Sequence, residues 1–166
     1  MHCKFITKIF LFVPLILLSV QLCPGLAADK MVTVERVVDG DTIQVRNHSG
    51  SFRVRLWGID TPEYRQPYSQ AAKKFIIRLL GGKQVSLKIK DRDDYGRTVA
   101  TVRLADGRIA AEELLKAGMA WVHIYYCKEP ICNKWYAYEA QAREQKKGLW
   151  REKSPTPPWV WKHRKK

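Results

Sequence analysis

Alternation of apolar and polar residues runs from Met31 to Leu104 and constrains the fold more than any other feature of the chain. A period of two predicts strands with one buried face, and five segments show it, namely residues 32–38, 42–46, 52–57, 84–89 and 97–104. Between the third and fourth, residues 69–80 carry apolar side chains at helical spacing and end at Gly81-Gly82. A helix therefore interrupts the predicted sheet.

Two further helices are predicted, over residues 109–117, ended by Gly118, and over residues 133–147, ended by Gly148. Five strands with a helix after the third favour a small closed barrel of the oligonucleotide-binding (OB) type, with a sandwich as the alternative. We predict a mainly β (α+β) domain over residues 29–152, a five-stranded OB-fold barrel with three packed helices.

The first 28 residues have a different character. Residues 6–22 are nearly all apolar, follow Lys4 and Lys8, and lead to small residues at Ala27 and Ala28. This pattern is typical of a secretory signal peptide, so we expect cleavage near Ala27 or Ala28 and export to the periplasm or the extracellular space. An uncleaved membrane anchor is the alternative, but the apolar stretch is short for spanning a bilayer. We expect a monomer without stable membrane association after cleavage.

The chain is strongly basic. Its formal net charge is +14, and loss of the predicted signal, which holds two lysines and no acid, leaves about +12. A field of this sign attracts nucleic acid or an anionic membrane surface, and it says nothing by itself about catalysis.

Two cysteines, Cys127 and Cys132, remain after the predicted signal. In an exported domain such a pair is expected to form a disulfide, with two unpaired thiols as the alternative. A zinc site is not expected, because the chain has no second cysteine pair once the predicted signal is removed, and His48, His123 and His163 are scattered.

Residues 153–166 contain three prolines, two tryptophans and a basic end. This composition predicts a tail without a core of its own. Two roles are open for it: a charged tether that contacts nucleic acid, or a strap in which Trp159 and Trp161 pack onto the barrel.

Three short runs place acids and arginines at strand ends: residues 39–42, 55–63 and 94–97. In a chain with excess positive charge, clustered carboxylates facing a polyanion need a hard cation to neutralise them, which indicates metal ligands beside arginines that bind phosphate. If Asp41 and Asp60 converge at one end of the barrel, they form a site for Ca²⁺ or a similar cation. Asp39 has a weaker claim, because Asp-Gly is also a common hairpin turn.

Glu63 follows Thr61-Pro62, where proline stiffens the backbone, so its carboxylate is placed to accept a proton from a water molecule. Arg55 and Arg97 lie at the edges of the same predicted site. Their guanidinium groups suit a phosphate whose charge grows in a transition state.

These runs, together with residues 105–107, 139–142 and 148–150, resemble the staphylococcal nuclease (thermonuclease) family over residues 31–150. The resemblance implies an OB-fold barrel with three helices and Ca²⁺-dependent hydrolysis of DNA and RNA with little sequence specificity. It also implies cleavage between phosphorus and the 5′ oxygen, leaving 3′-phosphate ends. A preference for single-stranded or frayed nucleic acid follows from a barrel surface that stacks exposed bases.

The resemblance also implies a role for each matching residue. The metal ligands are Asp41, Asp60 and the Thr61 carbonyl, the catalytic residues are Arg55, Glu63 and Arg97, and the residues beside the bound nucleotide are Tyr95 and Tyr126.

The chain departs from the family pattern in two places near the site. The segment from Glu63 to the first helix is shorter than in the staphylococcal type, so a mobile lysine-bearing loop is curtailed. Asp94 stands where the type member has lysine.

Two rival functions are open: an OB-fold module that binds nucleic acid without catalysis, and a cationic protein that acts on membranes through its tail. Loss of catalysis would show as decay of the acids or arginines, and those positions are filled. No amphipathic cationic helix accompanies the tail. A chelator separates these functions, because it should abolish hydrolysis and spare simple binding.

Overall fold

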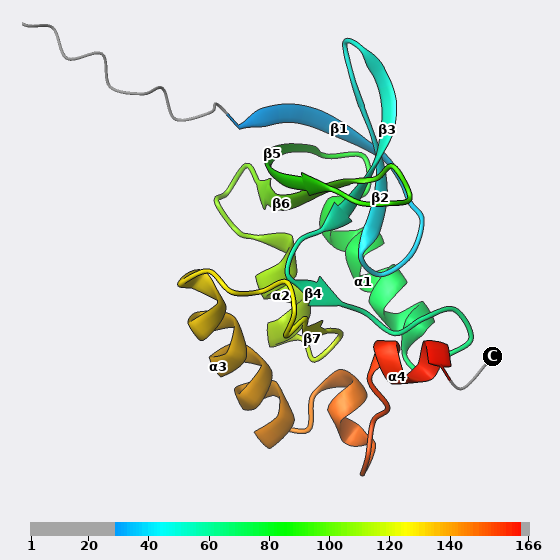
Figure 1. The fold of residues 1–166 in the computed structure, drawn as a ribbon, viewed down its shortest axis with the longest axis vertical. Helices are drawn as coiled ribbons and strands as arrows, with labels where there is room; N and C mark the ends of the chain where they lie inside the picture. The colour runs from blue at the N-terminus through cyan, green and yellow to red at the C-terminus, as the bar shows by residue number, and fades with distance from the viewer. Residues whose placement is uncertain (1–28, 164–166) are drawn as a thin grey trace, which may run out of the picture.

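The computed structural model describes residues 29–163 (Figure 1). The predicted signal peptide, residues 1–28, lies outside the described residues. Within the described range, no helix combines the length and the apolar character needed to cross a membrane.

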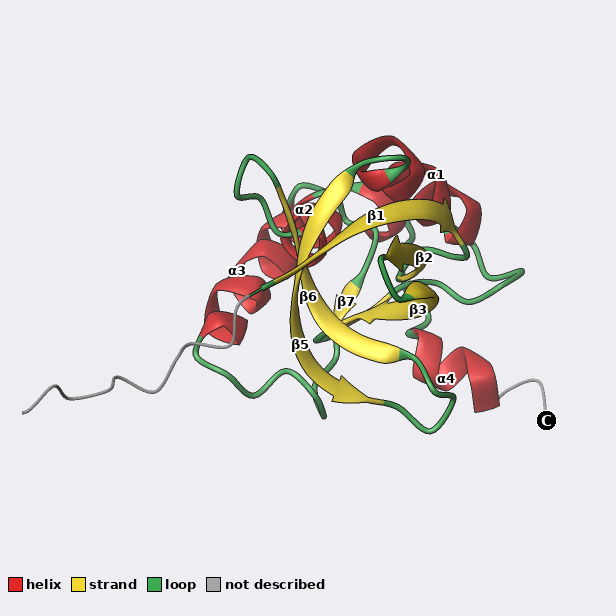
Figure 2. Ribbon diagram, turned by 90° about the horizontal axis from the view of Figure 1, so that it is seen from above, coloured by secondary structure: helices red, strands yellow, loops and turns green. Residues whose placement is uncertain are grey.

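A closed five-stranded barrel forms the core of the fold, as predicted. Its strands are β1 (Lys30–Val37), β2 (Thr42–Asn47), β3 (Gly50–Leu56), β5 (Gln84–Arg92) and β6 (Thr98–Leu104). They are ordered β1-β2-β3-β6-β5, and β1 pairs with β5 to close the barrel. The β3–β6 pair is parallel and the other pairs are antiparallel. Figure 2 shows the strands curling around a common axis, which excludes the sandwich.

The barrel interior is filled by alternate side chains of these strands. Ile43, Val45 and Val54 are fully buried, and Val34 and Leu87 almost so. Because successive side chains of a strand point to opposite faces, the alternation in the sequence becomes the division between the apolar interior and the polar surface.

Three helices accompany the barrel: α1 (Ser69–Leu80), α2 (Ala110–Lys116) and α3 (Ile131–Glu144). Of these, α1 and α2 pack on barrel strands, and α3 packs on α2 and on β7 (Trp121–Val122). The first has the predicted bounds and buries Ala72, Ile76, Leu79 and Leu80, one face of the helix. The third ends three residues earlier than predicted, and the chain turns at Lys146, which has a φ of 50°. A short 3-10 helix, η1 (Gly148–Arg151), follows.

A second, two-stranded sheet joins β4 (Ile59–Asp60) to β7 (Trp121–Val122). The sequence analysis missed it, because two residues are too few to show alternation. The Val122 N–H donates to the buried Glu139 carboxylate on α3 at 2.6 Å. Since Asp60 pairs with Trp121 in this sheet, α3 helps to fix the position of a candidate site residue.

The Cys127–Cys132 disulfide is present, with a Cα–Cα distance of 5.7 Å. Both cysteines are buried, and the bridge ties the loop after β7 to the first turn of α3.

The described part of the tail packs on the domain and contains a helix that was not predicted, α4 (Pro158–His163). The side chain of Gln66 donates to the Thr156 carbonyl at 2.6 Å, and Pro158 is buried. Trp159 packs against a buried cluster, which consists of Trp121, Ala142, Leu149 and Trp150. Figure 1 shows α4 beside the loop that leads from β4 into α1. The described tail is therefore a strap, which packs on this cluster and not on the barrel strands. Contact of the tail with nucleic acid stays a prediction.

We expect Gly58→Ala to destabilise the domain, because Gly58 has a φ of +76° and a Cβ there would lie 2.7 Å from the Trp135 ring. Gly82→Ala is the matched control, since Gly82 has a φ of +70° and nothing within 4 Å of an added Cβ. Backbone strain costs both variants about 1–2 kcal/mol, and Gly58→Ala should lose further stability in urea unfolding. Equal unfolding midpoints would show that the Trp135 contact imposes no constraint.

Candidate active site

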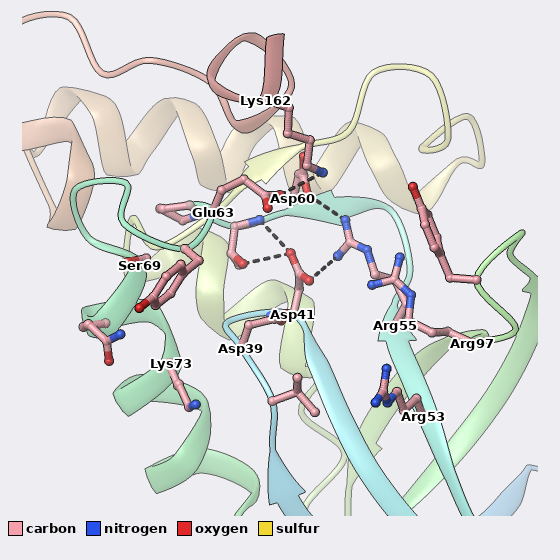
Figure 3. A pocket seen from close by; sticks show the side chains of 16 residues that line it. Asp39, Asp41, Arg53, Arg55, Asp60, Glu63, Ser69, Lys73, Arg97 and Lys162 are labelled. Carbon is pink, nitrogen blue, oxygen red and sulfur yellow. Dashed lines mark hydrogen bonds and ion pairs between the residues drawn. The ribbon is translucent and has the colours of Figure 1, made fainter. Parts of the chain in front are cut away.

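The predicted site residues meet at one cavity of about 460 Å³ (Figure 3). Seven of the predicted residues line it: Asp41, Arg55, Asp60, Thr61, Glu63, Tyr95 and Arg97. Tyr126 lines an adjoining cavity of about 590 Å³, which shares Arg55, Asp60, Tyr95 and Arg97 with the first. The structure therefore brings together residues that are spread over most of the described chain.

The strand register places the acids and Arg55 side by side. Asp41 ends the turn before β2, and its carbonyl accepts a hydrogen bond from the Leu56 N–H on β3 at 2.8 Å. Arg55 lies opposite Thr42 in the β2–β3 ladder. The side chain of Arg55 thus starts next to Asp41 and extends toward the end of β4.

A buried guanidinium joins two buried carboxylates at the centre of the cavity. Arg55 lies 2.7 Å from Asp41 Oδ1 through Nη1 and 2.6 Å from Asp60 Oδ1 through Nη2. The side chains of Asp41 and Asp60 are only 9% and 4% exposed. At such burial each carboxylate depends on its partner for compensation of its charge.

The other oxygen of Asp41 accepts two hydrogen bonds from Thr61. The Thr61 N–H and hydroxyl both donate to Asp41 Oδ2 at 2.8 Å. Gly40 makes room for this contact, because a Cβ at position 40 would lie 2.6 Å from Thr61 Oγ1. The sequence analysis assigned a role only to the Thr61 carbonyl; nothing in the sequence signalled the two donors.

The electrostatic potential around Asp39, Asp41 and Asp60 is strongly negative. Burial, with the charge of Asp41, raises the pKa of Asp60 to about 7 and that of Asp39 to about 6. Burial alone would also raise the pKa of Asp41, but Arg55 and the Thr61 hydrogen bonds outweigh it and lower the pKa. Ionisation of all these acids together is therefore unfavourable unless further positive charge enters.

This donor set fits a hard cation. Asp41 and Asp60 are close enough to share one guanidinium, and carboxylate oxygens are ligands that Ca²⁺ prefers. Within residues 29–163, no three His, Cys, Asp or Glu side chains are grouped so that they could hold a metal. A cation here would complete its shell with backbone oxygen and water.

Glu63 lies at the rim of the cavity with one third of its side chain exposed. Its N–H donates to Gln66 Oε1 at 2.9 Å, which fixes the turn after Pro62. Lys162 of α4 places its Nζ 2.8 Å from Glu63 Oε1. The sequence analysis did not single out Lys162; the only signal was the basic character of the tail.

Arg97 enters the cavity from the β5–β6 hairpin. Its Nε donates to Asp93 Oδ2 at 2.7 Å and its Nη1 to Thr42 Oγ1 at 3.2 Å. Tyr95, 86% exposed, lies under the Arg97 guanidinium, 5.4 Å from ring centroid to Cζ. Asp93, which orients Arg97, was missed, although its spacing of four residues from Arg97 across a tight turn was visible.

Tyr126 is exposed in the loop after β7 and contacts His123, with ring centroids 4.5 Å apart. It lines the adjoining cavity, together with Asp60, and does not line the cavity that holds Asp41 and Glu63. Its assignment to a bound nucleotide, like that of Tyr95, stays a prediction.

The five-stranded barrel is the fold that the family resemblance implied, and its acids and arginines lie at one cavity. Residues 53–152 match the staphylococcal nuclease homologue family, and the chain belongs to that family.

Named relatives agree with this assignment. An uncharacterized endonuclease of Escherichia coli O157:H7 is 38% identical over 154 residues, which cover 93% of this chain and 98% of that protein. A micrococcal nuclease of Shigella flexneri is 35% identical and shares 84% of each chain. The staphylococcal-like nuclease CAN1 of Arabidopsis thaliana is 36% identical over 69% of this chain and 34% of its own length. The family and the names of these relatives support nuclease activity on nucleic acid.

Arg55→Ala should lower the free energy of unfolding by about 3–5 kcal/mol at neutral pH without divalent metal, because it removes the positive charge that two buried carboxylates share. Arg53→Ala, in the same cavity but exposed, is the control and should change stability by less than about 0.5 kcal/mol. Denaturant unfolding measures both. A wild-type midpoint for Arg55→Ala would mean that the ion pairs do not hold the site together.

Proposed function

We propose that this protein is an exported, Ca²⁺-dependent nuclease that hydrolyses DNA and RNA with little sequence specificity and leaves 3′-phosphate ends. One observation supports this function most: Arg55 joins two buried carboxylates, those of Asp41 and Asp60, and Glu63 and Arg97 line the same cavity. Export rests on the signal-peptide pattern of the sequence, and we propose a periplasmic or extracellular monomer without stable membrane association.

In this proposal Asp41 and Asp60 hold the cation together with the Thr61 carbonyl. Bound Ca²⁺ supplies positive charge beside a phosphoryl oxygen. The Thr61 N–H and hydroxyl hold the Asp41 carboxylate in one orientation, so that its geometry is set before substrate binds.

The remaining residues act on the nucleophile and the phosphate. Glu63 accepts a proton from the attacking water, which its partial exposure permits. Arg55 and Arg97 donate to the phosphate oxygens as negative charge grows on them. Asp93 and Thr42 keep the Arg97 guanidinium turned toward the cavity.

Single-stranded or frayed nucleic acid is the preferred substrate in this proposal. Tyr95 and Tyr126 offer exposed rings on which bases can stack, and the basic surface attracts the backbone irrespective of sequence.

A binding module without catalysis is the second candidate, favoured by the same barrel and charge. It predicts that nucleic acid is bound but left intact, both with Ca²⁺ and with chelator.

Glu63→Gln should lower turnover by at least about 100-fold, because it removes the proton acceptor. The Ca²⁺ concentration for half-maximal activity should stay close to that of wild type, since Glu63 is not a proposed ligand. Glu144→Gln, an exposed change on α3, is the control and should keep wild-type activity. Steady-state hydrolysis of single-stranded DNA measures both variants, and wild-type turnover by Glu63→Gln would remove Glu63 from the mechanism.

Asp41→Ala should chiefly raise the Ca²⁺ concentration required for activity, by about 10-fold or more, because it deletes a proposed ligand. Asp106→Ala removes an exposed acid in the turn after β6 and serves as the control. Activity is titrated with Ca²⁺ for each variant. A titration of Asp41→Ala that overlays wild type would reduce Asp41 to a structural turn residue.

A further inference from the structure

Lys162 lies in α4, near the C-terminal end of the described chain, and its side chain lines the active-site cavity. Figure 3 shows its side chain descending from α4 toward Glu63 and Asp60, while Arg55 approaches from β3. Lys162 lines both the cavity that holds the acidic cluster and the adjoining cavity that holds Tyr126. It therefore stands where the two cavities meet.

The backbone of α4 is packed on the domain, whereas the Lys162 side chain is about half exposed and can change its rotamer. Thr156, Pro158 and Trp159 fasten the segment to the domain by a hydrogen bond, burial and aromatic packing. The Lys162 side chain is 55% exposed, and its four-carbon stem has several rotatable bonds. The ammonium group can change partner without detachment of the helix.

Lys162 is the cation paired with Glu63, and its ion pair is more exposed than those of Arg55 and Arg97. Arg55 is buried between Asp41 and Asp60, and Arg97 is bound to Asp93. Lys162 pairs with Glu63, a partly exposed carboxylate, and such pairs contribute about 1 kcal/mol or less. A phosphate that enters the cavity would offer Lys162 a better partner than Glu63 does.

We propose that Lys162 is a substrate-binding residue of this active site, which binds a backbone phosphate of the nucleic acid beside Glu63. The strap formed by α4 thus supplies part of the phosphate-binding surface. When Lys162 turns to the phosphate, the Glu63 carboxylate is released to face the attacking water. This proposal rests on the proposed function, because it takes the cavity to be where nucleic acid is cleaved.

Binding without catalysis tests the proposal directly. The probe is a short, fluorescently labelled single-stranded oligodeoxythymidylate, titrated in chelator so that metal-dependent cleavage cannot contribute. Lys162→Ala should weaken binding by about tenfold, the lower end of what loss of a charged hydrogen bond costs. The slope of log affinity against log salt should fall by about 0.7.

Two further variants make the result specific. Lys162→Arg keeps the charge and should restore most of the affinity and the slope. Lys153→Ala removes an exposed cation from the same segment, outside both cavities. Its affinity for the probe should stay closer to that of wild type than the affinity of Lys162→Ala. Urea unfolding of each variant verifies that the strap is still packed.

Three results would overturn the proposal: a Lys162→Ala variant that binds like Lys153→Ala with a parallel salt plot, failure of Lys162→Arg to restore binding in a folded protein, or faster DNA hydrolysis by Lys162→Ala. The last result would make the Glu63 contact inhibitory. A wild-type protein that binds the probe in chelator but leaves DNA intact with Ca²⁺ would instead contradict the proposed function.

Discussion

The site depends on one interaction, the buried contact of Arg55 with Asp41 and Asp60. Two carboxylates this close and this poorly hydrated repel each other, and the guanidinium between them offsets only part of that repulsion, since the pKa of Asp60 is still raised to about 7. Two strand pairs position this contact. The β2–β3 register places Arg55 next to Asp41, and the β4–β7 pair places Asp60 on the other side of Arg55. A site with such excess negative charge fits a cation.

Elements far from the cavity hold its parts in place. Glu139 of α3 accepts a hydrogen bond from β7, whose partner strand carries Asp60. Gly40 allows the close contact by which Thr61 orients Asp41. The tail packs on the cluster around Trp121 and brings Lys162 to Glu63. The rigidity of the site therefore derives from both ends of the described chain, and the strap is joined to the active site as well as to the core.

Regular patterns made the barrel and α1 predictable. Alternation over several residues identified the five long strands, and helical spacing followed by Gly81-Gly82 gave the bounds of α1. Features that depend on a single long-range contact were not predictable. The two-residue strands β4 and β7 carry no periodicity, and α4 is a short helix that packs on the domain. The site residues could be named because their motifs match a family. The structure was needed to find the bridging position of Arg55, the two Thr61 donors, Asp93 and Lys162.

The central claim is that these carboxylates support metal-dependent hydrolysis that leaves the phosphate on the 3′ side. The most direct test is incubation of the purified protein with single-stranded DNA in Ca²⁺ or in chelator, followed by polymerase extension of the products with and without phosphatase treatment. We predict cleavage in Ca²⁺ alone, with product ends that a polymerase extends only after phosphatase has removed a 3′ phosphate. Cleavage that continues in chelator, or products extended without phosphatase, would contradict the account.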